Sequence, residues 1–221
     1  MNIILFGLPG SGKGTQAYKI SDKFELEHIS TGDLLRNEIK KNTDIGKKVK
    51  SIIDSGKLIP DELINEIINS DYNKDLNYIF DGYPRTLEQS NFFDEYLATQ
   101  GKKIDIVIFL ELETKVVFNR LLGRRKCPNC GENFNVYYNP PKNNPFCDIC
   151  GTKLETRKDD KEDTIQKRME VYEFETKPLL NYYSEKNVLV KVDASKSEKE
   201  VFETLLKIVS KKLNKVKDGT Y

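Results

Sequence analysis

The sequence predicts an α/β fold in which a doubly wound, parallel sheet forms a three-layer core with helices on both of its faces. Two observations predict it. Short apolar runs alternate along the chain with segments of helical periodicity, and a glycine-rich segment directly follows the first apolar run. Continuous apolar runs are typical of parallel strands that are buried on both faces. Because such sheets bind ligands at the carboxyl ends of their strands, we expect the functional site there.

The expected strands are four apolar runs and one shorter segment. The runs cover residues 3–6, 78–80, 106–110 and 188–192, and the shorter segment consists of His28 and Ile29. Such apolar runs are typical of buried parallel strands.

Helix-start signals lie between the strands. Pro60 opens one helix, and Thr86 with Gln89 three residues later forms a capping box ahead of a second. Ser197 and Glu200 repeat that box before an amphipathic helix near the C-terminus. Beyond it, residues 215–221 are expected to be frayed.

Composition limits the classes of partner. The chain has 221 residues, of which 32% are charged, yet its net charge is only +1. This near balance favours a small anionic ligand, held by local cations, over a nucleic acid. No N-terminal signal and no run of about 18 apolar residues is present, so we expect a cytoplasmic protein with no membrane partner.

The glycine-rich segment is a candidate phosphate-binding loop. It reads Gly7-Leu8-Pro9-Gly10-Ser11-Gly12-Lys13-Gly14-Thr15. Glycines allow positive φ, so several backbone N–H groups point at one anion, and the following helix N-terminus and Lys13 add positive charge. The expected ligand is a nucleoside triphosphate, and the alternative is a plain connection between strand and helix. The Walker pattern has Ser or Thr where this chain has Gly14, so either Thr15 or water takes the place of that hydroxyl on the metal side.

A second unusual segment, from about residue 123 to residue 160, is rich in Asn, Pro, Gly and Cys and has no helical periodicity. It holds two Cys-x-x-Cys pairs, Cys127 with Cys130 and Cys147 with Cys150. Four such thiolates can surround one zinc ion tetrahedrally, and a closed four-sulfur shell is structural because it leaves no position for substrate. Disulfides are the alternative, but a reducing compartment and the geometry of a Cys-x-x-Cys bridge disfavour them.

Candidate phosphoryl-transfer residues are the scarce arginines and one aspartate. The arginines near turns or helix starts are Arg36, Arg85, Arg120, Arg124, Arg157 and Arg168. Forked guanidinium groups bind phosphate oxygens and neutralise the charge of the transferring group, although any single arginine can simply be a solvated surface residue. Asp81 ends the second long strand along the chain, where its carboxylate would hold magnesium through water. Its alternative role is a turn or helix cap.

The loop, the segment Asp81-Gly82-Tyr83-Pro84-Arg85 and the cysteine insert together resemble the long-form adenylate kinases, whose lid carries zinc. The resemblance runs over residues 1–206. It implies a P-loop NTPase core made of residues 1–29, 60–122 and 161–221. It also implies a helical domain for the nucleoside monophosphate at residues 30–59 and a zinc-bearing lid at residues 123–160.

The resemblance also implies roles for particular residues. The implied ATP contacts are Gly10, Ser11, Gly12, Lys13, Gly14, Thr15, Arg120, Arg124, Asn133, Phe134 and Lys196. The implied AMP contacts are Thr31, Arg36, Lys57, Leu58, Ile59, Gly82, Tyr83, Pro84, Arg85, Gln89, Arg157 and Arg168. The implied catalytic residues are Lys13, Asp81, Arg85, Arg120, Arg124, Arg157 and Arg168. Where the family often has a tyrosine for stacking on adenine, Phe134 keeps the ring without the hydroxyl.

The implied activity is the reversible, magnesium-dependent transfer of the terminal phosphoryl group from ATP to AMP, which gives two ADP and maintains the balance of adenine nucleotides. Closure of the lid excludes water, and adenylate kinases are themselves a standard example of such gating. We expect a monomer in which Gln89 reads the adenine edge of AMP and Phe134 and Arg124 stack on the ATP base. The alternatives are a UMP/CMP kinase, which usually has a short lid, and a nucleic-acid-binding zinc-ribbon protein with an ATPase core.

Overall fold

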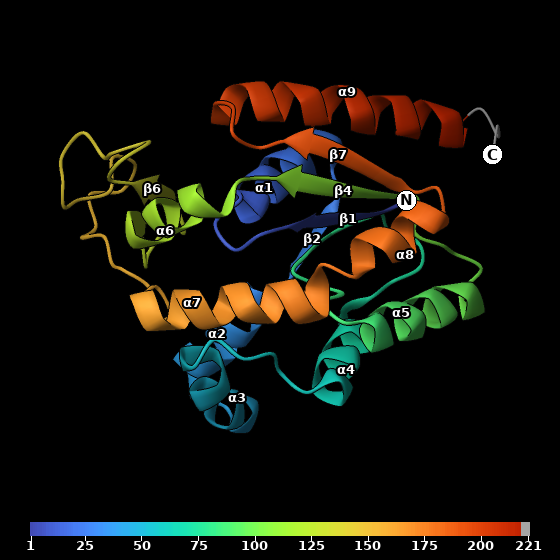
Figure 1. Cartoon of the computed structure of the whole chain (residues 1–221), viewed down its shortest axis with the longest axis horizontal. Coiled ribbons are helices and arrows are strands. Elements are labelled where there is room, and N and C mark those ends of the chain that lie inside the picture. Colours follow the sequence, from blue (N-terminus) through green and yellow to red (C-terminus); the bar gives the residue numbers. More distant parts are fainter. Residues whose placement is uncertain (218–221) are drawn as a thin grey trace.

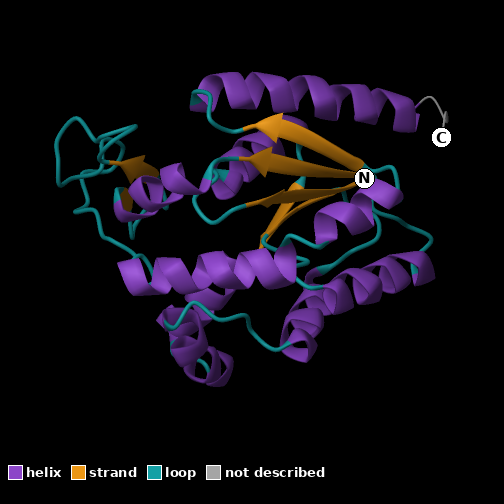
Figure 2. Ribbon diagram, in the orientation of Figure 1, coloured by secondary structure: helices purple, strands orange, loops and turns teal. Residues whose placement is uncertain are grey.

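A computed structural model describes residues 1–217, without the side chains of residues 70, 71 and 215–217. It contains a parallel sheet of five strands in the order β2-β3-β1-β4-β7, with helices on both faces (Figures 1 and 2). The strands are β1 (Asn2–Gly7), β2 (Glu27–Ser30), β3 (Tyr78–Asp81), β4 (Ile106–Glu111) and β7 (Leu189–Asp193). The predicted fold class and all five predicted strands are confirmed, with ends that differ by at most one residue.

Apolar strand residues form the core, as their continuous runs predicted. Ile3, Ile4, Phe80, Val107 and Leu110 are fully buried. Parallel strands with helices on both faces have no solvated side, so each position along the strand can be apolar.

The strand register brings the carboxyl ends of β1 and its neighbours together. Leu5 of β1 pairs with Asp81 of β3, and Gly7 of β1 pairs with Leu110 of β4. Since β1 lies between β3 and β4, the chain changes direction across the sheet at β1. This is the switch point at which doubly wound sheets bind ligands.

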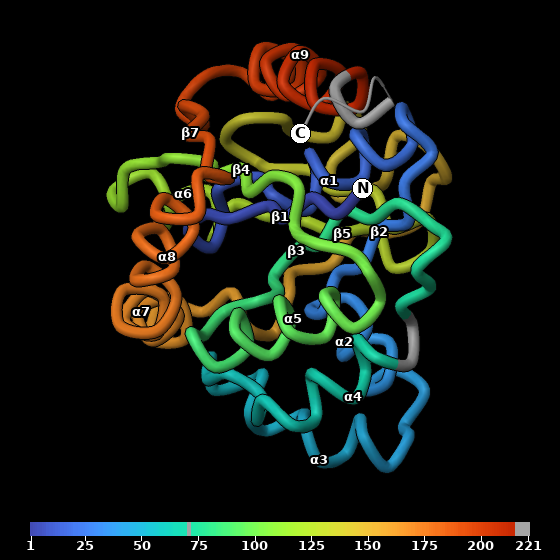
Figure 3. Tube along the Cα trace, turned by 90° about the vertical axis from the view of Figure 1, so that its right-hand side faces the viewer, coloured from blue at the N-terminus to red at the C-terminus, as the bar shows by residue number. Residues whose placement is uncertain are grey.

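The helices cover the two faces of the sheet unequally (Figures 1 and 3). Helices α1 and α9 pack against each other on one side of the sheet, while α5, α7 and α8 lie on the other. The helices are α1 (Lys13–Phe24), α2 (Thr31–Lys41), α3 (Asp44–Asp54), α4 (Asp61–Asp71), α5 (Leu87–Thr99), α6 (Thr114–Leu122), α7 (Glu162–Val171), the π-helical turn η1 (Tyr172–Thr176), α8 (Leu179–Glu185) and α9 (Glu198–Lys217). Part of the stretch expected to be frayed, residues 218–221, lies outside the described residues.

Both predicted capping boxes are present in some form. At α9, the Ser197 hydroxyl accepts from the Glu200 N–H at 3.3 Å, and the Glu200 carboxylate accepts from the Ser197 N–H at 3.1 Å. At α5, the Thr86 hydroxyl accepts from the Gln89 N–H at 3.1 Å, but the Gln89 side chain accepts from the N–H of Arg85. In the α5 box, the side chain of Gln89 therefore binds the N–H of Arg85, one residue before the N–H of Thr86 that a standard capping box would use.

Two segments project from the core. The flap, which we define as residues 30–59, contains α2 and α3. The lid, which we define as residues 123–160, contains the antiparallel pair β5 (Arg124–Lys126) and β6 (Asn133–Asn135) and has no helix among its described residues. A small separate cluster of Cys127, Phe134, Cys147 and Leu154 fills the lid. Among the described residues, no helix is both long and apolar enough to cross a membrane.

Candidate functional site

The phosphate loop lies where the sequence predicted it, between β1 and α1 at the switch point. Gly10 and Gly12 have φ values of 79° and 95°, a region that L side chains rarely adopt. Gly12 is the N-cap of α1, and no side chain caps this helix start. The buried Ser11 hydroxyl has no hydrogen-bond partner among the described residues. Uncapped N–H groups and an unpaired hydroxyl at a helix N-terminus suit an anion.

Lys13 folds back onto this loop. Its ammonium donates to the carbonyl oxygens of Gly7 at 2.8 Å and Leu8 at 2.9 Å. Burial lowers the pKa of Lys13 to about 8, against the opposing effect of Asp81, and nearby arginines such as Arg85 lower it further. The loop thus holds a buried cation whose charge is poorly compensated, and a bound phosphate would compensate it.

Position 14 has glycine where the Walker pattern has Ser or Thr, and the structure gives a steric reason for the missing side chain. A Cβ atom added at Gly14 would lie 3.2 Å from Oδ2 of Asp81, at the end of β3. The missing side chain therefore leaves room for a carboxylate beside the start of α1. A carboxylate oxygen is a hard donor of the kind that magnesium prefers, so Asp81 fits the role predicted for it.

A pocket between the flap and the core brings together most of the residues predicted to contact AMP. It holds about 610 Å³ of space not filled by protein, which includes the solvent at its mouth. Of the predicted set, its lining includes Thr31, Arg36, Lys57, Leu58, Ile59, Gly82, Arg85, Gln89 and Arg168. Apolar Leu35, Ile53 and Ile64 also line it. We call it the acceptor pocket.

A second pocket, of about 570 Å³ on the same measure, contains Lys13 and continues the first. Five residues line both pockets: Gly56, Leu58, Gly82, Arg85 and Arg168. Arg85 donates from Nε to the Gly82 carbonyl at 2.7 Å, and burial together with Arg168 lowers its pKa, although a guanidinium stays charged in proteins. Two fixed cations, Arg85 and Arg168, therefore lie between the phosphate loop and the acceptor pocket.

Three predicted AMP residues do not line the acceptor pocket. Pro84 lines only the second pocket. The Tyr83 ring is buried, and its hydroxyl donates to Asn65 at 2.9 Å. Arg157 lies in the lid, 3.9 Å from the Asp33 carboxylate of the flap.

Acidic residues that the sequence analysis did not single out orient the arginines on the lid side. Asp160 accepts two hydrogen bonds from Arg124, at 2.6 and 2.8 Å, and Asp159 accepts one from Arg168 at 3.0 Å. Burial opposes ionisation of Asp159, but Arg168 and the other arginines outweigh it and lower its pKa. The adjacent pair Asp159-Asp160, two residues after Arg157, was the signal available in the sequence.

The lid touches the flap through Asp33. Its carboxylate lies 2.7 Å from Arg36, 3.1 Å from Lys126 and 3.9 Å from Arg157, so one residue of the flap faces two cations of the lid. Although burial alone would raise the pKa of Asp33, these cations hold it well below its ordinary value. The structure therefore has the lid and flap in contact.

The residues expected to contact the rest of ATP lie outside the two pockets. Arg120 donates to the Ala194 carbonyl at 3.0 Å, near Lys196, and its guanidinium lies 5.5 Å from the ring of Tyr138. Neither Asn133, on β6, nor Lys196 lines the two pockets.

In this structure, Phe134 and Arg124 are both engaged within the protein, and their stacking roles stay predictions. The Phe134 ring is only 8% exposed because it fills the lid cluster, and Arg124 is engaged by Asp160. The exposed ring beside Arg120 is that of Tyr138, which the sequence analysis did not single out. The paired aromatic residues 137 and 138 were the available signal.

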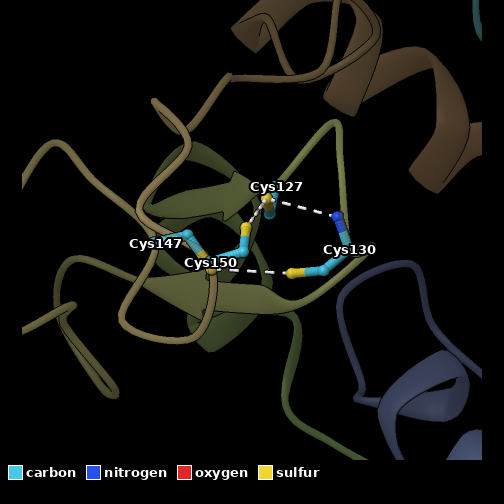
Figure 4. A group of neighbouring side chains, drawn as sticks. All are labelled: Cys127, Cys130, Cys147 and Cys150. Atoms are coloured by element: carbon cyan, nitrogen blue, oxygen red, sulfur yellow. Dashed lines mark hydrogen bonds between the residues drawn. The ribbon is translucent and has the colours of Figure 1, made fainter.

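The four cysteines converge as their spacing predicted (Figure 4). Their sulfur atoms all lie within 4.8 Å of one another, with Cys127 and Cys150 at 3.4 Å and Cys130 and Cys147 at 3.6 Å. All four are free thiols, so the disulfide alternative is not realised. Sulfur atoms bound tetrahedrally to one zinc ion stand about 3.8 Å apart, so this cluster has the size and chemistry of a metal site.

A parallel α/β sheet with this loop after its central strand belongs to the P-loop class of nucleotide-binding proteins. The family model for adenylate kinase matches residues 5–188, so the chain belongs to the adenylate kinase family. An adenylate kinase of Thermoanaerobacter sp. (strain X514) is 45% identical over 210 residues, which make up 94% of this chain and 97% of that protein.

Two further relatives cover a similar share. An adenylate kinase of Caldicellulosiruptor bescii is 46% identical over 193 residues, or 86% of this chain and 90% of that protein. One of Clostridium perfringens (strain SM101 / Type A) is 41% identical over 212 residues, or 95% of this chain and 98% of that protein.

Proposed function

We propose that this protein catalyses reversible phosphoryl transfer from ATP to AMP, giving two ADP, at the paired pockets described above. The observation that carries the proposal is the sharing of Arg85 and Arg168 by both pockets, with Lys13 on one side and Arg36 on the other. Two phosphate chains that approach from opposite sides would meet at these cations. Phosphoryl transfer requires mainly such positioning and charge stabilisation, and no covalent intermediate on the protein.

Donor and acceptor contacts divide between the two pockets in this proposal. The loop residues Gly10, Ser11, Gly12, Lys13, Gly14 and Thr15 would bind the ATP phosphates, while Arg120, Arg124, Asn133, Phe134 and Lys196 would contact the rest of ATP. Thr31, Arg36, Lys57, Leu58, Ile59, Gly82, Tyr83, Pro84, Arg85, Gln89, Arg157 and Arg168 would contact AMP. Lys13, Arg85, Arg120, Arg124, Arg157 and Arg168 would stabilise the transferring group.

Two metals belong to the proposal. Asp81 would hold magnesium through water, and the ion would neutralise phosphate charge beside Lys13. Cys127, Cys130, Cys147 and Cys150 would hold zinc, whose role is to stabilise a lid that has only a small hydrophobic cluster of its own.

The proposal also includes the division into domains, the cellular compartment and the oligomeric state. We assign residues 1–29, 60–122 and 161–221 to the core, the flap to AMP and the lid to closure over both nucleotides. The lid would exclude water, which otherwise accepts the phosphoryl group. Free thiols fit the reducing cytoplasm, and the near-neutral net charge of +1 fits a monomer that binds nucleotides and no nucleic acid.

The decisive experiment mixes the protein with ATP, magnesium and each nucleoside monophosphate in turn, and quantifies the diphosphates formed. AMP is expected to be converted with clearly the highest kcat/KM. Equal use of UMP or CMP would favour a UMP/CMP kinase. No transfer to any monophosphate, together with tight binding of nucleic acid, would favour the zinc-ribbon alternative.

A further inference from the structure

The side-chain amide of Gln89 is held at both ends by partners that cannot exchange roles. Its Nε2 donates to Oδ1 of Asp61 at 2.6 Å, and its Oε1 accepts from the backbone N–H of Arg85 at 2.7 Å. A carboxylate only accepts and a backbone N–H only donates, so these two partners define a single orientation of the amide. Gln89 is 2% exposed, so water does not replace either partner.

Asp61 is itself fixed in place. Its Oδ2 accepts from the Thr86 hydroxyl at 2.9 Å, and Thr86 also caps α5, the helix that carries Gln89. Asp61 is the first residue of α4, so its carboxylate joins the starts of two helices beside the acceptor pocket. An amide turned by 180° would set Nε2 against the Arg85 N–H and Oε1 against the carboxylate, which loses both hydrogen bonds.

The held amide keeps one N–H on Nε2 and one lone pair on Oε1 free of partners among the described residues. Gln89 lines the acceptor pocket, so these are the groups that a base there would meet. A 6-aminopurine offers a donor at N6 and an acceptor at N1, while a 6-oxopurine offers an acceptor at O6 and a donor at N1. A freely turning amide would satisfy either pattern, but a fixed one satisfies only one of them.

We propose that Asp61 is a positioning residue that makes the acceptor site selective for 6-aminopurine over 6-oxopurine nucleotides, by preventing the Gln89 amide from turning. The proposal rests on the proposed function, because that function identifies the base as adenine. Asp61 acts only through Gln89.

The first test uses the unaltered protein with three acceptors that share the same ribose phosphate. These are AMP, IMP and purine riboside 5′-monophosphate, which keeps the N1 acceptor and has only hydrogen at position 6. A held amide keeps one bond to the purine and opposes both polar groups of IMP, so kcat/KM should fall in the order AMP, purine nucleotide, IMP. If IMP is used better than the purine nucleotide, the amide turns freely and the proposal is wrong.

The second test is Asp61→Asn, since an asparagine can donate as well as accept. We expect the ratio of kcat/KM for AMP to that for IMP to fall by about tenfold, because the turned amide regains one partner. Glu62→Gln is the matched control. It removes an equal charge from the same turn of α4, but Glu62 is exposed and makes no contact with the amide, so the ratio should stay unchanged.

A double-mutant cycle measures the coupling between Asp61 and Gln89. In a Gln89→Met background, which has no amide to orient, Asp61→Asn should leave the AMP to IMP ratio unchanged. An equal change in both backgrounds would show that Asp61 acts by another route. Failure of the proposed function appears differently, as an unaltered protein that transfers phosphate to none of the three acceptors.

Discussion

At the scale of single residues, the chemistry of the phosphate loop depends on how Lys13 is solvated. Burial has lowered its pKa to about 8, so the nucleotide-free protein holds a mixture of ammonium and amine at slightly alkaline pH. Phosphate oxygens that bind beside it will raise that pKa again. Binding of ATP is therefore linked to uptake of a proton.

We predict that ATP binding at pH 8 takes up roughly half a proton, as follows from a pKa near 8, and that affinity declines as the pH rises further. ATP itself is fully ionised at this pH, so the uptake reports on the protein. Calorimetry in two buffers with different ionisation enthalpies measures it. In Lys13→Arg, whose side chain stays charged, the uptake should vanish, and an undiminished uptake would contradict the assignment to Lys13.

Arg85→Ala tests the cation shared by the two pockets. We expect kcat to fall by at least about two orders of magnitude, which is typical for loss of one preorganised donor to the transition state. The backbone bonds of residue 85 to Gln89 and Thr176 survive this change, so the fold should be retained. Arg125→Ala, whose guanidinium donates to backbone carbonyls of residues 122 and 124, is the control. Weaker ATP affinity with an unchanged kcat would mean that Arg85 does not act on the transferring group.

Residue types and spacing were enough to predict the phosphate loop and the cysteine cluster, because both are local motifs with a fixed geometry. The burial of the aromatic rings in the lid was not predictable in the same way. Phe134 and Tyr138 are both aromatic and only four positions apart, and it is the packing of the lid cluster that buries one ring and exposes the other. Similarly, Asp61 and Gln89 are 28 positions apart, and only the tertiary fold brings them together.

At the scale of elements, β1, β3 and β4 were predictable because each is a continuous apolar run that is buried almost throughout. The capping box at α5 was predicted, but its displaced return bond was not. The Gln89 side chain accepts from Arg85 rather than from Thr86 because the carboxylate of Asp61 already holds its other end. In the flap, the close packing of two helices depends on a glycine. Gly46 lets α3 approach the backbone of α2 so closely that a Cβ at this position would lie 2.2 Å from the Glu38 carbonyl oxygen.

The proposed zinc site makes the lid the element whose order should depend most on a metal. We predict one equivalent of zinc per chain by elemental analysis, and a first melting transition that moves to lower temperature on chelation. Cys130→Ser should reproduce the effect of chelation. Removal of metal that stops catalysis while melting is unchanged would instead give the metal a chemical role.

At the scale of the whole molecule, the lid and flap meet through charges that are partly exposed to solvent. The Asp33 side chain is 42% exposed and that of Lys126 is 29% exposed, so salt will screen their attraction. Since the folded pKa of Asp33 is lowered, the contribution of this contact is present above the ordinary aspartate pKa and is lost only as the pH falls through the lowered value. The contact is therefore insensitive to pH near neutrality.

We predict that Asp33→Asn lets the lid and flap separate more often in the absence of nucleotide. Resonance energy transfer between dyes on the lid and the flap, attached through unnatural amino acids to spare the cysteines, should show a longer mean separation. High salt should lengthen the separation in the unaltered protein and have little further effect in the variant. Equal separations in both proteins at low salt would mean that Asp33 does not hold the lid.

The lid cluster of Cys127, Phe134, Cys147 and Leu154 shares no buried residue with the main core. A segment with its own core opens as a separate cooperative unit, at a free energy below that of global unfolding. When metal is scarce, the lid of an otherwise folded molecule would then become a substrate for proteases. The lifetime of this protein in a cell would follow the supply of metal, and its abundance would fall under metal starvation before any change in the stability of its sheet.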